Sequence, residues 1–336
     1  MLKTKFTELT GCKVPIQLAG MGDVATPQLA AAVANAGALG MIGAPGSYQS
    51  PVLIEKYLAE TRRLTKGIFG INFIIAEYFF PDLSVVHNAV EMASKMANVV
   101  EFFYRKPDSS LVELVHKGGA LVFWQVGSKE EANAAAEAGC DVVVAQGIEA
   151  GGHIRGSLGL LSLLSEVVSS VDTPVLAAGG IGGGRAMAAA LTAGASGVRV
   201  GTRFISAQES GAHPQYVQAL INSEAKDTIF TEAFSGGWPN APHRVLRSSL
   251  EEAQAFKGDL VGKRDPYNTG QWEDIHRLEG DFPITKDVVG TIKAMPHWAG
   301  EGVGEVKGIQ SAEDIVKELV GDTEKMLRAS SSLLVS

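Results

Sequence analysis

Short apolar runs recur along the first two thirds of the chain, and segments with helical periodicity separate them. Eight runs are present, at residues 15–19, 39–43, 69–75, 98–104, 120–126, 141–146, 174–178 and 197–201. Polar and apolar residues alternate little within these runs, which is typical of parallel strands covered on both faces. The pattern therefore predicts eight strands joined by helices.

The segments between the runs end in a repeated way. Alanine-rich stretches at 28–36, 129–138 and 185–193 are followed by Gly37, Gly139 and Gly194. A glycine just past a helix tolerates the left-handed conformation that ends it. Because the same βα unit recurs eight times, we expect an α/β fold closed as a (β/α)8 TIM barrel, rather than an open doubly wound sheet.

The alternation of apolar runs and helical segments ends after residue 206. Residues 213–295 are richer in Trp, Pro and charged residues. We interpret them as a mostly helical insertion after strand eight, a lid that supplies Trp238 to the substrate pocket. An amphipathic helix at 311–319 is expected to pack back on the barrel. The predicted domains are thus a barrel (1–212 and 296–336) and an insertion (213–295).

Composition narrows the class of protein. Of the 336 residues, 46% are hydrophobic and 20% charged, and the net charge is −8 with no basic cluster, so nucleic acid is not expected as a partner. No stretch reaches the ~20 apolar residues of a membrane span, and the N-terminus has no apolar secretion signal. Cys12 and Cys140 lack metal-ligand spacing and are expected to be buried thiols. These features predict a cytoplasmic protein.

Glycine-rich turns follow strands seven and eight, at Gly179-Gly180 and at Gly201-Thr202. Turns at these two positions form the usual phosphate site of (β/α)8 barrels, because glycine lets backbone N–H groups approach the phosphate oxygens. The alternative is that the glycines at 182–184 merely turn the chain. Two such turns in the expected positions favour a phosphate site.

Amide side chains stand at the carboxyl ends of three strands. Asn72, Gln125 and Gln146 end strands three, five and six, and small residues (Ala19 and Gly20, then Met21) follow strand one. Buried amides need partners, and these would suit the edge of a heterocycle or a ribityl chain. They suit a metal poorly, since hard cations prefer carboxylates. The turn at 19–21 would let a flat ring lie over the barrel mouth, although alone it reads as an ordinary turn.

His153 follows strand six after Gly151-Gly152, and it is the only histidine at the carboxyl end of a predicted strand. Histidine is the residue best able to transfer a proton near neutral pH, so we predict a catalytic role. The alternative is a histidine in a surface loop. Glu149 would either orient a neighbouring backbone group or face solvent. The remaining six histidines are less suited by position: His87, His116, His213, His243, His276 and His297.

Several segments together resemble the nitronate monooxygenase family, formerly called 2-nitropropane dioxygenases. They are PIQ (15–17), LAAAVANAGALG (29–40), FGIN (69–72), AQGIEAGGH (145–153), AAGG (177–180), GTRF (201–204) and WAGEGVG (298–304). The resemblance spans nearly the whole chain and implies bound FMN without a metal. The residues expected at the cofactor are Ala19, Gly20, Met21, Asn72, Gln125, Gln146, Gly151, Gly152, Ala178, Gly179, Gly180, Gly201 and Thr202, with His153 as the catalytic residue.

The resemblance also implies an activity, the oxidation of alkyl nitronates by O2 to carbonyl compounds and nitrite. His153 would act as a base toward neutral nitroalkanes or, when protonated, would stabilise the anion. Some relatives carry Lys, Asp and Ser at the positions of Gln125, Gln146 and Ala178, and these differences mark subgroups with different substrates.

Three alternatives remain open at this stage. The first is an NAD(P)H-dependent flavin reductase on the same barrel, acting on quinones or enoyl-acyl carrier protein substrates. The second is a non-catalytic binder of a phosphate ligand. A third, an enzyme of the IMP dehydrogenase kind, is disfavoured because Cys12 and Cys140 precede their strands. A homodimer is considered for the assembly.

Overall fold

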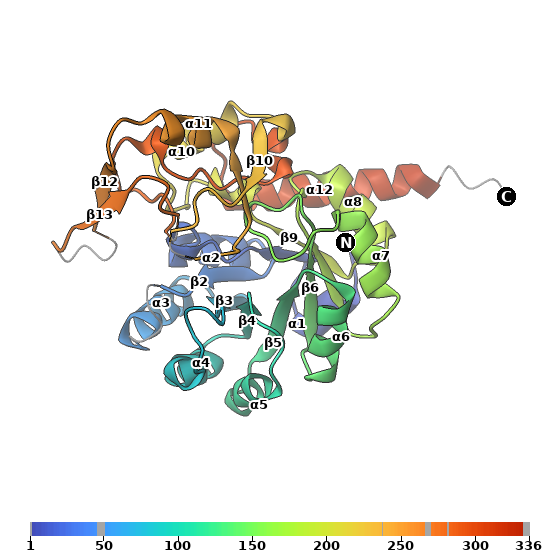
Figure 1. Ribbon diagram of the computed structural model, residues 1–336. Helices are drawn as coiled ribbons and strands as arrows, with labels where there is room; N and C mark the ends of the chain where they lie inside the picture. Colours follow the sequence, from blue (N-terminus) through green and yellow to red (C-terminus); the bar gives the residue numbers. More distant parts are fainter. Residues whose placement is uncertain (1, 46–50, 237, 266–269, 281, 332–336) are drawn as a thin grey trace.

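Eight parallel strands form the centre of the molecule (Figure 1). The computed structural model describes residues 2–45, 51–236, 238–265, 270–280 and 282–331. The strands are β1 (Ile16–Leu18), β2 (Gly40–Gly43), β3 (Phe69–Ile74), β4 (Val99–Phe103), β5 (Leu121–Val126), β6 (Val142–Gln146), β8 (Val175–Ala178) and β9 (Gly197–Val200). Each lies within one of the eight apolar runs, so the predicted strands are confirmed.

The sheet closes on itself. Its order is β1-β9-β8-β6-β5-β4-β3-β2, and a parallel bridge between Gln17 and Leu39 joins the two end strands. The Leu18 amide donates to the Leu39 carbonyl at 2.9 Å, and the Leu39 amide donates to the Ile16 carbonyl at 2.9 Å. The predicted (β/α)8 barrel is therefore confirmed.

Helices cover the outside of the barrel between successive strands (Figure 1). They are α2 (Pro27–Asn35), α3 (Pro51–Leu64), α4 (Ser84–Met96), α5 (Ser109–Gly118), α6 (Lys129–Glu137), α7 (Leu160–Val168) and α8 (Gly184–Thr192), and α1 (Lys5–Thr10) precedes β1. Gly37, Gly139 and Gly194 have φ angles of 90°, 92° and 100°, so the predicted left-handed helix ends are present. The expected return helix is α12 (Ala312–Ser331), which continues well beyond residue 319 and packs on α8 and α2.

The segment 213–295 corrects one prediction, because it is not mostly helical. Its described residues hold α10 (Pro214–Ile221) and α11 (Arg247–Ala255) beside five strands: β10 (Thr228–Thr231), β11 (His243–Leu246), β12 (Leu260–Arg264), β13 (Glu273–His276) and β14 (Val289–Gly290). Strands of two to five residues carry too little alternation to be recognised. One of them, β11, pairs with β7 (Gly152–His153), which lies far away in the sequence, and β10 pairs with the other edge of β11.

The insertion has its own hydrophobic core and sits at one end of the barrel (Figure 1). Val24 and Ile205, from turns that follow barrel strands, pack in this core, and so do Val303 and Val306. The insertion therefore covers the carboxyl ends of the strands, and the stretch up to Val306 packs with it.

Three further observations concern the cysteines, membrane spans and metal sites. Cys12 and Cys140 are buried free thiols, as expected. Among the described helices, none has both the length and the apolar character that crossing a bilayer requires. The described residues also contain no group of three His, Cys, Asp or Glu side chains arranged to hold a metal.

Candidate active site

The predicted site residues meet at the mouth of the barrel because the strand-end turns pack on one another. A Cβ atom added to Gly20 would lie 2.4 Å from the Cβ of Asn72, so the turn after β1 contacts the end of β3 directly. A Cβ on Gly201 would lie 3.3 Å from the Ala19 Cβ and 3.6 Å from the Met21 Sδ. The turns after β1 and β9 therefore form one continuous surface.

The turn after β8 has the conformation that a phosphate cradle needs. Gly179 and Gly180 have φ angles of 115° and 65°, in the left-handed region that favours glycine. Neither amide donates a hydrogen bond within the described residues. Across the mouth, Thr202 Oγ1 accepts from the Gly300 amide at 3.0 Å, which leaves its own O–H free to donate.

The glycines at 182–184 have a different role. A Cβ on Gly182 would lie 2.3 Å from the Gly302 carbonyl oxygen, and a Cβ on Gly183 would lie 3.2 Å from the Glu305 Cδ. Gly183 is also the N-cap residue of α8. These glycines allow the returning chain to pack closely, which agrees with the alternative interpretation that they turn the chain.

The three predicted amides differ in their surroundings. Gln146 donates from Nε2 to the His153 carbonyl at 3.0 Å, and its Oε1 is buried without a hydrogen-bond partner. Asn72 and Gln125 instead join a buried network that contains Glu101 and Arg199. This network was not predicted, although a carboxylate (Glu101) and a guanidinium (Arg199) stand inside the apolar runs of β4 and β9.

His153 is held between the barrel and the insertion. Its strand β7 pairs with β11, which places His153 directly opposite His243. Four rings surround the imidazole, with centroids 4.3 Å (Trp238), 5.4 Å (Trp298), 5.6 Å (His243) and 5.9 Å (Tyr104) away. The predicted wall residue Trp238 thus lies against the predicted catalytic residue.

The imidazole of His153 is neutral at physiological pH. Burial, with a smaller contribution from His243, lowers the pKa of His153 to about 3. The residue keeps part of its surface exposed, but its Nδ1 is buried and has no hydrogen-bond partner among the described residues. An unpartnered buried ring nitrogen at the mouth is available to a ligand, as an acceptor or as a donor depending on the tautomer.

His243, one of the six histidines considered less suited by position, lies beside His153. Its Nε2 accepts from the Phe234 amide at 3.3 Å, so its Nδ1 carries the proton and donates to the Ala241 carbonyl at 2.9 Å. Both nitrogens are thereby occupied, and His243 supports the loop beside His153. No sequence signal links the two histidines, because their contact depends on long-range strand pairing.

Tyr104 is a further residue of the mouth that the sequence analysis placed only in a strand. Its φ angle of 69° is unusual for a bulky residue and is stabilised by surrounding contacts. The ring lies 4.5 Å from Trp238, and the hydroxyl donates to the Ile154 carbonyl at 3.4 Å. Burial raises the pKa of Tyr104 to about 12, so the hydroxyl stays protonated.

The loop between β6 and β7 is anchored through two adjacent residues, Ile148 and Glu149. Both carboxylate oxygens of Glu149 accept from the Leu160 amide at the start of α7, at 2.9 Å. The guanidinium of Arg244 donates to the Ile148 carbonyl at 3.1 Å and 2.9 Å. Glu149 therefore orients backbone, which was one of the two roles considered for it.

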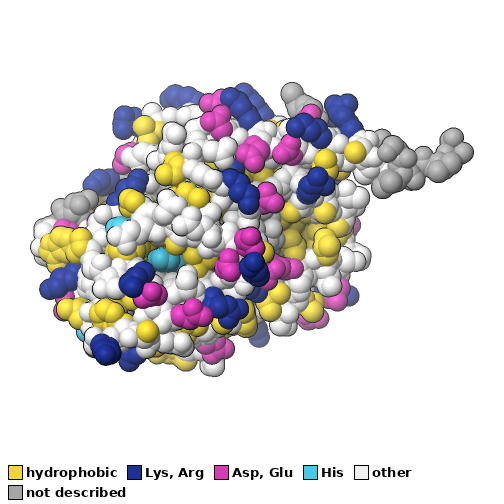
Figure 2. Space-filling model, turned by 90° about the horizontal axis from the view of Figure 1, so that it is seen from above, with side chains coloured by type: hydrophobic (Ala, Val, Ile, Leu, Met, Phe, Trp, Pro, Cys, Tyr) yellow, Lys and Arg dark blue, Asp and Glu magenta, His cyan; other side chains and the backbone are white. Residues whose placement is uncertain are grey.

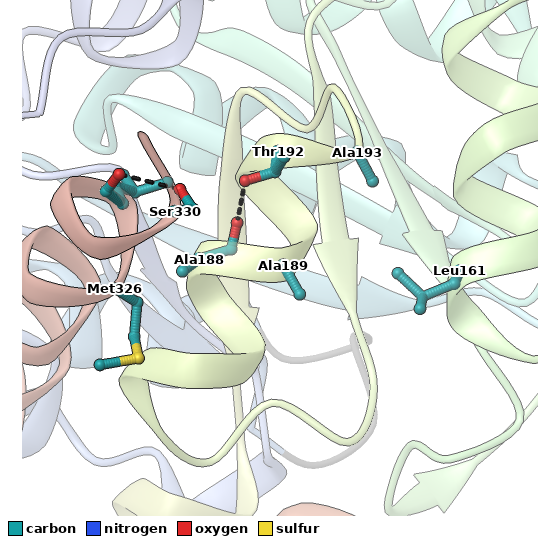
Figure 3. Close-up of a pocket in the computed structure, with 8 residues that line it drawn as sticks. Leu161, Ala188, Ala189, Thr192, Ala193, Met326 and Ser330 are labelled. Atoms are coloured by element: carbon teal, nitrogen blue, oxygen red, sulfur yellow. Dashed lines mark hydrogen bonds between the residues drawn. The ribbon is translucent and has the colours of Figure 1, made fainter. Parts of the chain in front are cut away.

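Outside the mouth, the described surface includes a largely apolar groove. A groove between α7, α8 and α12 is lined by Leu161, Ala188, Ala189, Thr192, Ala193, Met326, Leu327 and Ser330 (Figure 3). Its two hydroxyl groups donate to carbonyls of their own helices at 2.8 Å. Seen from above the insertion, acidic and basic side chains are intermixed over the surface (Figure 2).

Comparison with known proteins identifies the family. The family model described as nitronate monooxygenase matches residues 3–322. The chain belongs to the nitronate monooxygenase family. A probable nitronate monooxygenase of Staphylococcus aureus is 32% identical over 332 residues, which cover 84% of this chain and 92% of the relative.

Solved structures support the same placement within the nitronate monooxygenase family. FabK from Thermotoga maritima has a TM-score of 0.80 and 28% identity, covering 99% of this chain and 100% of its own. A nitroalkane oxidase from Streptomyces ansochromogenes has a TM-score of 0.76 and 28% identity, covering 96% and 99%. The protein is an FMN-dependent oxidoreductase.

The polar groups at the mouth of the barrel are suited to binding FMN. The left-handed turn at Gly179-Gly180 offers free amides to a phosphate, and the unpartnered Gln146 Oε1 offers an acceptor to a ribityl hydroxyl. The side chain of Glu149 lies beside Gly180, and its carboxylate is turned toward the Leu160 amide of α7. That these particular residues contact FMN is our proposal.

The buried His297 is expected to make the stability of the protein depend on pH. Burial lowers the pKa of His297 to about 4, below the ordinary 6.5. Between pH 6.5 and 4 the unfolded chain binds protons that the folded chain does not, so the free energy of unfolding falls as pH falls. We expect His297→Gln to lessen this fall, by at most about 1.4 kcal/mol per pH unit, in urea unfolding between pH 7 and pH 5.

The matched control is His87→Gln on the exposed face of α4. This variant is expected to keep the wild-type dependence on pH. Equal slopes for His297→Gln and the wild type would contradict the assignment of the pH dependence to His297.

Proposed function

We propose that the protein oxidises alkyl nitronates with O2 to carbonyl compounds and nitrite. The observation that carries the proposal is the enclosure of His153, a neutral imidazole with an unpartnered Nδ1, by the rings of Trp238, Trp298 and Tyr104. An aromatic enclosure with one polar atom suits a small alkyl compound with a single polar head. Membership of the nitronate monooxygenase family supports the same substrate class.

The residues at the mouth would each serve this reaction in a defined way. The bound flavin supplies the redox chemistry. His153 Nδ1 would accept the α-proton of a neutral nitroalkane or donate to the nitro oxygens, and Gln146 holds the His153 backbone from below. Trp238 and Trp298 would exclude water from the reacting carbon. Because His153 is neutral, the base role is favoured over a protonated stabiliser.

The alternative is a reductase that takes its electrons from NADH or NADPH. The likeness to FabK from Thermotoga maritima is at least as close as the likeness to the nitroalkane oxidase, which keeps this candidate open. A dinucleotide would need room beside the flavin, whereas Trp238 is packed against both His153 and Tyr104. The packing favours the smaller substrate.

Anaerobic titration of the purified, flavin-loaded protein distinguishes the candidates. We expect an alkyl nitronate to bleach the visible flavin absorbance, and NADH and NADPH to bleach it slowly or not at all. Admission of air should then restore the absorbance and release nitrite. Rapid bleaching by NADPH, with none by nitronates, would overturn the proposal in favour of the reductase. A protein that is colourless and takes up no FMN would indicate a non-catalytic binder.

A further inference from the structure

Five polar side chains cross the interior of the barrel just below its mouth. They are Gln17, Asn72, Glu101, Gln125 and Arg199, and each is at most 8% exposed. They come from β1, β3, β4, β5 and β9 respectively. Side chains that point into a (β/α)8 barrel are usually bulky and apolar, so a polar layer needs an explanation.

An ion pair spans the width of this layer. Glu101 Oε1 lies 2.8 Å from Arg199 Nη1. In the closed order of eight strands, β4 and β9 are four strands apart in either direction, so the pair joins opposite sides of the barrel. Burying two charges costs desolvation energy that their attraction does not necessarily recover. Stability alone is therefore a weak reason for the pair.

The ion pair fixes how the neighbouring amides are turned. A guanidinium has only donors, so the atom of Gln125 that faces Arg199 must be its oxygen, and the Nη1 of Arg199 donates to Gln125 Oε1. A carboxylate that is ionised has only acceptors, so Asn72 faces Glu101 with its nitrogen. Asn72 Nδ2 donates to Glu101 Oε1 at 2.7 Å, and Gln17 Nε2 donates to Glu101 Oε2 at 2.6 Å.

These contacts also determine which atom of each amide group is left over for a ligand at the mouth. Gln125 keeps its NH2 group and Asn72 keeps its Oδ1, and neither has a hydrogen-bond partner among the described residues. A Cβ on Gly20 would lie 3.1 Å from the Asn72 Oδ1, so this oxygen lies at the turn after β1. The mouth thus presents a donor from β5 and an acceptor from β3.

We propose that Glu101 and Arg199 are positioning residues that set this donor and acceptor pattern for the imide edge of the flavin. That edge carries an N–H between two carbonyl groups, so it needs an acceptor for the N–H and a donor for a carbonyl. Asn72 Oδ1 supplies the acceptor and Gln125 Nε2 supplies the donor. The inference rests on the FMN cofactor of the family and not on the nitronate substrate.

The test adds the N3-methyl analogue of FMN, which has lost the imide N–H, to the holoprotein. The extent to which the analogue displaces the bound FMN measures the preference for FMN. We expect the wild type to prefer FMN by about tenfold or more, since the analogue leaves a buried acceptor unpaired. In the double variant Glu101→Gln with Arg199→Gln, amides that turn freely replace both charges. Its preference should fall to about threefold or less. Arg199→Lys keeps a donor-only group and should retain the preference.

A second variant keeps the test valid if the double variant does not fold. Gln125→Glu places a carboxylate beside Arg199, so the guanidinium of Arg199 keeps an acceptor at this position. At the mouth, however, an acceptor oxygen replaces the Gln125 NH2 donor. We expect about tenfold weaker FMN binding, measured by the fluorescence of FMN released on dilution. The control is Glu318→Gln on the outer helix α12, which removes the charged partner of the buried Arg203 and leaves its bond to Gln310, and this variant should bind FMN normally.

Two results would overturn the proposal. One is a folded double variant, with a wild-type melting temperature, that still prefers FMN over the analogue as strongly as the wild type does. The other is unchanged FMN affinity in Gln125→Glu. Neither readout depends on nitronate turnover, so a failure of the proposed function would be distinguishable from a failure of this inference.

Discussion

Replacing His153 by Asn is expected to leave FMN bound and to slow the oxidation of neutral nitroalkanes by about 100- to 10,000-fold, the usual contribution of a positioned base. The reason is that His153 Nδ1 is buried without a hydrogen-bond partner among the described residues, in a ring that contacts Trp238 and Trp298. Preformed nitronates need no proton removal and should lose far less activity. Steady-state rates with the two forms of one substrate make the comparison.

The control for this substitution is His87→Asn on the exposed face of α4, which should be as active as the wild type. A further check is the pH profile of the wild type on neutral nitroalkanes. Because the pKa of His153 is lowered to about 3, kcat/KM should show no inflection near the ordinary histidine value of 6.5. Undiminished turnover of neutral nitroalkanes by His153→Asn would refute the base role.

The second large effect is expected from Gly179→Ala, which should lower FMN affinity by at least about tenfold. A Cβ at Gly179 would lie 3.1 Å from the Gly147 carbonyl oxygen and 3.2 Å from the Ala150 amide nitrogen. The φ angle of 115° adds strain of about 1–3 kcal/mol, so the turn would shift and its amides would no longer converge on the phosphate. The flavin content of the purified variant measures the loss.

Gly119→Ala separates backbone strain from loss of the cofactor site. Gly119 has a φ angle of 93° after α5, and an added Cβ would meet nothing within 4 Å. Both variants should lose thermal stability, but only Gly179→Ala should lose FMN. If the two variants bound FMN equally well, the turn after β8 would not be the phosphate site.

The barrel was predictable from the sequence, whereas the insertion was not. Strands covered on both faces give continuous apolar runs, and glycines such as Gly37 and Gly139 mark the helix ends locally. The short strands of the insertion carry no such local signal. The pairing of β11 with β7 depends on contacts between residues about 90 positions apart, such as His153 and His243.

The candidate site was predictable in outline and incomplete in detail. Glycine turns and strand-end amides follow from the rule that barrel sites lie at the carboxyl ends of strands. The side chains that orient the amides cannot be deduced from this rule. Glu101 and Arg199 stand inside apolar runs where a charge is conspicuous, but only the closed barrel shows that they meet. Tyr104 and Trp298 reach His153 through folding alone.

The pairing of β7 with β11 limits how this enzyme can be recombined with its relatives. His153 lies on a two-residue strand whose hydrogen-bonding neighbour belongs to the insertion, and Ile154 donates to the Pro242 carbonyl at 2.8 Å. A chimera that exchanged only residues 213–295 would give this histidine a foreign neighbouring strand. A chimera designed to take over the substrate range of a relative should therefore exchange residues 147–154 together with the insertion.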